Sequence, residues 1–174
     1  VYTKWINDLG DEQRPTGELP GIVPTSGWGY KWGNGPAWDS AFLLIPLYLY
    51  EYCGDTRLFR DHYDRMKRYV DYLTSKAKDG IVDIGLNDWA PFETKTPADI
   101  TSTAYYYRDA RIVALAASLL GNEADALKYA SLAAGIKQAF NRKFYHPETG
   151  LYGNGSQTSL SCALYQGLAD PDIR

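Results

Sequence analysis

The chain has 174 residues, 45% of them hydrophobic, which is enough for one globular unit with a buried core. Its net charge of −3, without any cluster of Lys and Arg, argues against nucleic acid as a partner. The longest apolar run, Ala41 to Tyr50, is too short to span a bilayer, so no membrane partner is expected.

The first predicted helix covers residues 38–53 and follows a loop that is unusually aromatic. This loop contains Trp28, Tyr30 and Trp32 within a few residues of one another, and it ends at Trp38. The helix itself is apolar on nearly every face until its last turn. Such a helix is typically covered by neighbours on most sides.

Four further helices alternate between one-sided and all-round apolar patterns. Residues 56–78 and 123–144 each carry one apolar stripe at helical spacing, with charged residues on the other faces. Residues 98–120 and 157–167 are apolar almost all round, apart from a short charged patch after Tyr107. The predicted stripe of the 56–78 helix consists of Phe59, Tyr63, Met66, Val70, Leu73 and Ala77.

The alternation repeats with a period of about sixty residues, which is longer than the period of common helical solenoids. Each buried helix ends in a tight turn, as at Gly54-Asp55 and Gly121-Asn122, and each follows a long loop. An open α-solenoid and a closed α/α toroid both fit this pattern. Long loops that always precede the buried helices favour the toroid. The sequence therefore predicts an all-α fold of (α/α)6-toroid type, with about half of the ring in residues 1–174.

Two of the long loops place a tryptophan beside a carboxylate at the same end of the predicted fold. These pairs are Trp38 with Asp39 and Trp89 with Asp88. A pyranose ring stacks its C–H face on an aromatic ring, and carboxylates and amides bind its hydroxyls. The loops therefore predict a carbohydrate site. Further polar and aromatic candidates in the three loops are Asn87, Phe92, Glu93, Asp99, Tyr152, Asn154 and Gln157.

Each candidate also has a purely structural explanation. Trp38 can fill the core at a helix entry, while Asp39 and Asp99 can each cap a helix N-terminus. Glu93 can simply be a solvated loop residue. Taken one at a time, these explanations are favoured, and only the recurrence of the Trp–Asp pair in two loops favours binding.

Other chemistries lack their residues. His62 and His146 lie far apart, and His62 is expected on a helix surface, so no metal triad and no cofactor are predicted. Cys53 and Cys162 have no CxxC or His neighbour and are expected to be free, buried thiols.

An ordered series of motifs resembles the α-L-rhamnosidases, which are six-hairpin glycosidases of glycoside hydrolase family 78. The series consists of "KWINDLGDEQRPTGELPGIVP", "GPAWDSAFLLIPLYLYEYCGD", "MKRYVDYL", "NDWAPFETKTPADITSTAYYYRDARIVALAASLLG" and "FNRKFYHPETGLYGNGSQTSLSCALYQGL". It covers essentially the whole chain. The resemblance implies a single segment, residues 1–174, of an inverting glycosidase domain that removes terminal α-L-rhamnose.

The resemblance also implies which residues bind the sugar. Trp38 and Trp89 match the two stacking tryptophans of the family, and Asp88 matches by position. The family motif Trp-Gly-Asp-Ala appears as Trp38, Asp39, Ser40 and Ala41, so the carboxylate is displaced by one position onto Asp39. The catalytic acid and base of the family have no counterpart in this chain and are expected outside it.

The expected partners are a rhamnoside substrate and, for the open side of a half ring, either the remaining hairpins of a longer protein or a second copy. Two alternative functions remain. One is an α/α-toroid glycosidase acting on another sugar, and the other is a non-catalytic helical-repeat module that binds carbohydrate or protein.

Overall fold

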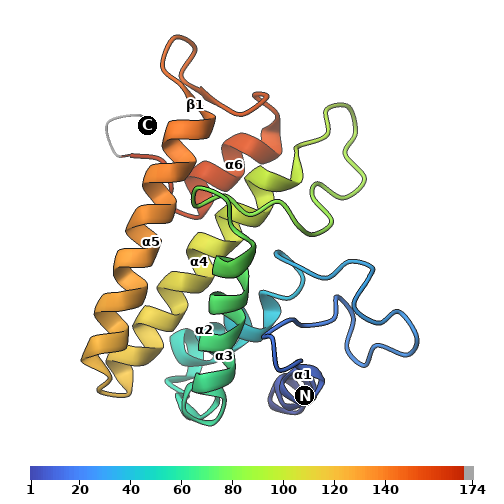
Figure 1. The fold of residues 1–174 in the computed structure, drawn as a ribbon, viewed down its shortest axis with the longest axis vertical. Helices are drawn as coiled ribbons and strands as arrows, with labels where there is room; N and C mark the ends of the chain where they lie inside the picture. Colours follow the sequence, from blue (N-terminus) through green and yellow to red (C-terminus); the bar gives the residue numbers. More distant parts are fainter. Residues whose placement is uncertain (171–174) are drawn as a thin grey trace.

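The computed structural model describes residues 1–170 and is built mainly of helices (Figure 1). Because the elements alternate as predicted, the all-α class and the five predicted helices are confirmed. None of the helices in this range is long and apolar enough to cross a membrane. The elements are α1 (Tyr2–Glu12), α2 (Ala41–Cys53), α3 (Arg57–Lys76), α4 (Ala98–Leu119), α5 (Glu123–Phe144), β1 (Tyr145–His146), β2 (Leu151–Tyr152) and α6 (Gln157–Tyr165).

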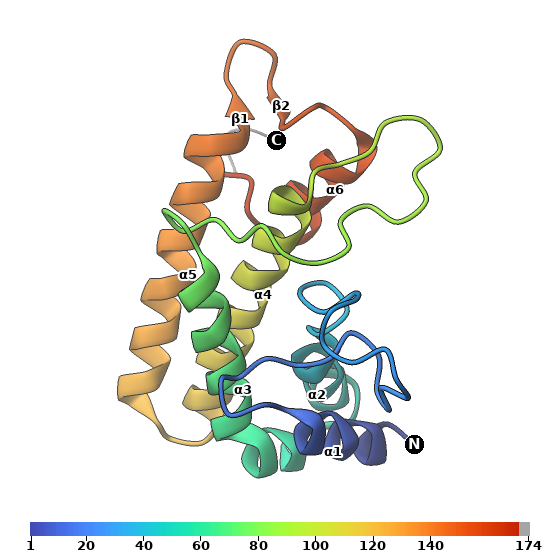
Figure 2. The ribbon, with the colours of Figure 1, turned by 45° about the vertical axis from the view of Figure 1, so that its right-hand side comes forward.

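The inner helices α2, α4 and α6 contact one another in chain order, and the outer helices α3 and α5 pack beside them. The long antiparallel pair of α4 and α5 forms the spine of the molecule (Figures 1 and 2). α3 and α5 each bury one stripe, and α4 is buried on most faces, as predicted. α2 and α6 depart from the prediction, since Tyr48 and Tyr52 of α2 and Leu164 and Tyr165 of α6 are exposed. No element within residues 1–170 covers these sides.

The turns between inner and outer helices contain glycine in the left-handed conformation, as the sequence predicts. Gly54 has φ 67° and donates its N–H to the carbonyl of Tyr50 at 2.8 Å, which ends α2. Gly121 has φ 77° after α4. These tight turns leave the long connections at the opposite ends of the inner helices. Figure 2 shows the loops before α2 and α4 projecting on the same side of the molecule.

Helix α1 was not predicted from the sequence. It packs on α2 and α3 and buries Ile6 and Leu9, whose spacing of three residues was the available signal. Its presence corrects the prediction for His62, which is buried rather than on the surface. The His62 Nε2 atom lies 2.8 Å from Asn7 Oδ1 of α1 because α1 covers this part of α3.

Two further details differ from the predictions. A short antiparallel hairpin pairs Tyr145 with Tyr152 and His146 with Leu151, and "HPETGL" carried its turn signal. Both cysteines are free, but neither is fully buried as predicted: Cys53 is exposed and Cys162 is half-buried. Cys53 lies in the last turn of α2, where the helix has no covering neighbour among the described residues.

Candidate functional site

Four tryptophans form a continuous row on the loop side of the molecule. The ring centroids of Trp28 and Trp32 lie 4.7 Å apart, and those of Trp32 and Trp38 lie 5.6 Å apart. Trp89 of the second loop joins the row, 6.2 Å from Trp38 and 6.3 Å from Trp32. Trp38 is 41% exposed and Trp89 65%, so their rings offer free apolar surface rather than filling the core.

Trp38 is held in position by the loop that precedes α2. The carboxylate of Asp39 accepts a hydrogen bond from the backbone N–H of Gly35 at 2.6 Å, which closes the turn before Trp38. The Ser40 hydroxyl then donates to Asp109 Oδ2 of α4 at 2.6 Å. These hydrogen bonds hold the start of α2 against α4, so the main chain that carries Trp38 is fixed in position.

Asp39 faces the interior, because only 1% of it is exposed. Burial raises its pKa well above the ordinary value for a carboxyl group, and the nearby Asp109 raises it further. Its side chain does not cap α2, since the N-cap residue is Ser40. The structure therefore places Asp39 behind the tryptophan row, on the side away from solvent.

Asp88 and Trp89 occupy a sharp turn in the loop before α4. The residues on either side of the pair, Asn87 and Ala90, both have positive φ, at 57° and 49°. This turn directs Trp89 toward Trp38. Asp88 lies near Cys162 of α6. Burial raises the pKa of the Cys162 thiol to about 11, and the charge of Asp88 contributes to this rise.

The two tryptophan-bearing loops touch each other through their main chains. A Cβ atom added at Gly85 would lie 2.4 Å from the carbonyl oxygen of Pro36, so only glycine fits there. The Ser102 hydroxyl of α4 lies within hydrogen-bond reach of the carbonyls of Pro36, at 3.3 Å, and Ile84. One side chain of an inner helix thus links both loops.

Several other candidates make their contacts within the loops or the core and are not part of the tryptophan row. The Tyr30 hydroxyl donates to the carbonyl of Glu12, and the guanidinium of Arg14 lies 3.7 Å from the centre of its ring. Asp99 lies in the first turn of α4 and pairs with Lys143 at 2.7 Å. Tyr152 is buried and donates to Asn141 Oδ1 at 2.6 Å. Glu93 is exposed, in agreement with its structural explanation.

The sequence interpretation overlooked Asp109, which is fully buried in α4. Burial raises its pKa to about 7. An acid in the short charged patch of a helix that is otherwise apolar almost all round was the signal that it has a specific role. Within residues 1–170, no group of three His, Cys, Asp or Glu side chains converges in a way that would hold a metal ion.

Alternating inner and outer helices, with aromatic and acidic side chains gathered on the loops before the inner ones, define an α/α-hairpin protein of the six-hairpin glycosidase class. The model of the bacterial alpha-L-rhamnosidase six-hairpin glycosidase domain matches residues 1–174. The chain belongs to this family.

Named relatives agree with this assignment. An alpha-L-rhamnosidase of Streptomyces avermitilis is 30% identical over 175 residues, which cover 99% of this chain and 16% of the relative. The structure of an alpha-L-rhamnosidase from Dictyoglumus thermophilum is 36% identical, with a TM-score of 0.88 over 99% of this chain and 20% of that one. The Streptomyces avermitilis enzyme complexed with L-rhamnose gives a TM-score of 0.89 at 28% identity, over 99% of this chain and 16% of that one. The chain therefore spans about a fifth or less of the length of these proteins.

Proposed function

We propose that residues 1–174 are one segment of an α-L-rhamnosidase catalytic domain, and that they supply the aromatic wall of its rhamnose pocket. The observation that supports this most directly is the exposed Trp38–Trp89 pair, 6.2 Å apart, beside Asp88. The two rings would stack on the apolar face of the sugar, and the Asp88 carboxylate would accept hydrogen bonds from its hydroxyls. Family membership favours this function over a non-catalytic repeat module.

In this proposal Asp39 supports the wall without touching the sugar. Its carboxylate is buried and bonded to Gly35, so it fixes the turn that carries Trp38. The reaction is hydrolysis with inversion, which uses one carboxylic acid on the leaving oxygen and one carboxylate that activates water on the opposite face. We place both groups in parts of the full-length protein outside residues 1–174.

The central test is Trp89→Ala in the full-length protein, assayed on an aryl α-L-rhamnoside. We expect kcat/KM to fall roughly tenfold, equivalent to about 1.4 kcal/mol of lost stacking. The melting temperature should stay nearly unchanged, because the ring is 65% exposed. Trp28→Ala is the matched control with a smaller expected effect, since Trp28 is similarly exposed at the other end of the row.

Two outcomes would contradict the proposal. A large loss of stability with unchanged kinetics would make Trp89 a packing residue. Turnover by the isolated 174-residue chain, abolished by Asp88→Asn or Glu93→Gln, would place the acid–base chemistry inside these loops. We expect the isolated chain to be inactive on the same substrate.

A further inference from the structure

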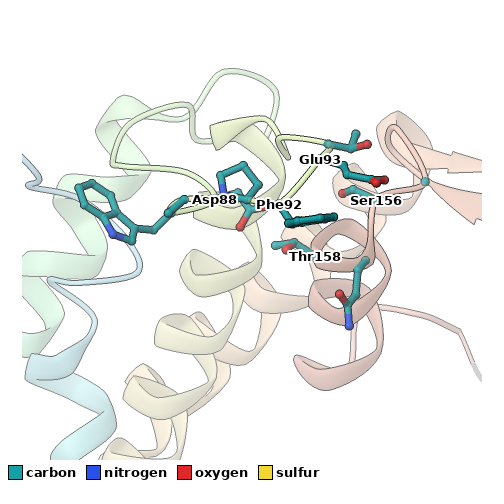
Figure 3. A pocket seen from close by; sticks show the side chains of 11 residues that line it. Asp88, Phe92, Glu93, Ser156 and Thr158 are labelled. Carbon is teal, nitrogen blue, oxygen red and sulfur yellow. The ribbon is translucent and has the colours of Figure 1, made fainter.

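A second cavity lies next to the tryptophan row, between the loop before α4 and the start of α6. Its volume is about 490 Å³. Figure 3 shows Asp88 and Phe92 on one side and Ser156 and Thr158 on the other. Because α2, α4 and α6 follow one another in space, this cavity is the next position along the rim after the Trp38–Trp89 pair.

The two walls of this cavity are joined at their base by hydrogen bonds. The hydroxyls of Thr96 and Ser156 lie 2.5 Å apart, and Asn154 Nδ2 donates to the carbonyl of Lys95 at 3.0 Å. Ser156 also caps α6 by accepting from the N–H of Ser159 at 3.1 Å. The cavity is therefore held open by fixed elements and is formed before any ligand arrives.

The lining of the cavity combines one free aromatic ring with many hydroxyl-binding groups. Phe92 is 98% exposed, which is unusual for a phenylalanine. Asp88 and Glu93 provide carboxylate acceptors, and Gln157 and Thr158 provide groups that both donate and accept. An apolar platform surrounded by such groups has the chemistry to bind a pyranose ring.

The cavity is continuous with the proposed rhamnose wall, because Asp88 and Trp89 line it and Trp89 also contacts Trp38. A ligand that occupies both the proposed rhamnose wall and this cavity therefore needs two linked rings, one on each side of Trp89. We infer that this cavity is the subsite for a second sugar ring, the one from which rhamnose is cleaved, with Phe92 as its stacking platform. This inference rests on the proposed rhamnosidase function.

The test compares two probes on the full-length protein and its Phe92→Ala variant. The probes are free L-rhamnose, measured as an inhibitor, and a rhamnosyl-glucose disaccharide, measured as a substrate. We expect Phe92→Ala to raise KM for the disaccharide roughly tenfold and to change the inhibition constant of rhamnose less than twofold. Phe92→Tyr keeps the ring and should behave like the wild type. Trp89→Ala is the contrasting control, because it should weaken both probes.

The inference is overturned if Phe92→Ala affects both probes equally or neither of them. A marked fall in the melting temperature of Phe92→Ala would also overturn it, because Phe92 would then pack against the rest of the protein. A wild-type protein that hydrolyses no α-L-rhamnoside is a different result, since the proposed function itself then fails. If the wild-type protein hydrolyses α-L-rhamnosides, but Phe92→Ala does not change KM for the disaccharide relative to the inhibition constant of rhamnose, only the second-ring subsite is refuted.

Discussion

At the scale of single residues, two buried carboxyl groups lie beneath the exposed tryptophans. Asp109 is fully buried and accepts a hydrogen bond from Ser40, while Asp39 is bonded to the turn before α2. Burial raises the pKa of both carboxyl groups, and the charge of Asp109 raises the pKa of Asp39 further. The support of Trp38 therefore depends on groups whose protonation in the folded state differs from that in the unfolded chain.

This difference makes stability depend on pH. The pKa of Asp109 is about 7 in the folded state and near the ordinary 3.8 in the unfolded chain, so the folded state binds the extra proton. Stability from this group is therefore present at low pH and is lost as pH rises from about 4 to about 7. Asp109→Asn is neutral at every pH. We expect the melting temperature of this variant, relative to the wild type, to increase with pH across that window.

The difference in the free energy of unfolding between the variant and the wild type should change by about 1.4 kcal/mol per pH unit, as long as the folded and unfolded states of the wild type differ by one proton. Melting curves of both full-length proteins at several pH values measure this difference. Asp61→Asn, at an exposed position of α3, is the control for the removal of a surface carboxylate. A pH-independent difference for Asp109→Asn would show that Asp109 is already ionised in the folded protein.

At the scale of elements, α4 organises the site through two neighbouring hydroxyls. Ser102 lies within reach of the carbonyls of Pro36 and Ile84, which belong to different loops. Thr103 accepts from the N–H of Val82 at 3.0 Å and donates to its carbonyl at 3.3 Å, so it holds only the second connection. Both are buried, and only Ser102 links the two tryptophan-bearing loops.

Variants of Ser102 and Thr103 separate an effect on the relative position of the two tryptophan-bearing loops from a general loss of stability. Ser102→Ala and Thr103→Ala should each cost about 1–3 kcal/mol, because each leaves buried backbone groups without a partner. Only Ser102→Ala should also weaken inhibition by rhamnose, by severalfold, since it releases Trp38 relative to Trp89. Thermal unfolding and rhamnose inhibition are measured on the same samples. Equal weakening of rhamnose inhibition in both variants would refute the linking role of Ser102.

The sequence predicted the helices well because their apolar spacing records burial directly. It missed α1, whose apolar face is only a few residues wide, and the β1–β2 hairpin, whose strands have two residues each. For the site, the sequence shows the neighbouring tryptophans and acids, but it does not show which of their side chains face solvent. Asp39 is buried because its carboxylate turns back to Gly35, and that contact depends on a turn geometry that residue types alone do not specify.

At the scale of the whole molecule, the exposed side of α2 forms an apolar groove with α6. Its aromatic residues include Tyr52, which is 83% exposed, and Tyr165, which is 74% exposed, and Cys53 lies among them. Its volume is about 580 Å³. Such a surface is usually covered by a partner, and we propose that further hairpins of the full-length protein cover it.

Cys53 provides a direct measurement of this covering. In the native full-length protein, its thiol should react with a maleimide or disulfide reagent at least tenfold more slowly than in denaturant, because the neighbouring hairpins exclude the reagent. Cys53→Ser identifies its share of the total signal. Reaction of Cys53 at the same rate in both states would show that the groove is open. A second copy as the covering partner would instead make protection depend on protein concentration.

The contact between Gly35 and Gly85 has a consequence for how such a pocket can diverge. An added Cβ at Gly35 would lie 3.0 Å from the Cα of Gly85, so the main chains of the two loops meet directly there. Exposed side chains further along each loop can therefore be substituted without altering the distance between the two main chains at this contact. In the proposed rhamnose pocket, substitution at the loop tips would change single contacts with a sugar, whereas replacement of either glycine would move the two loops apart as a whole.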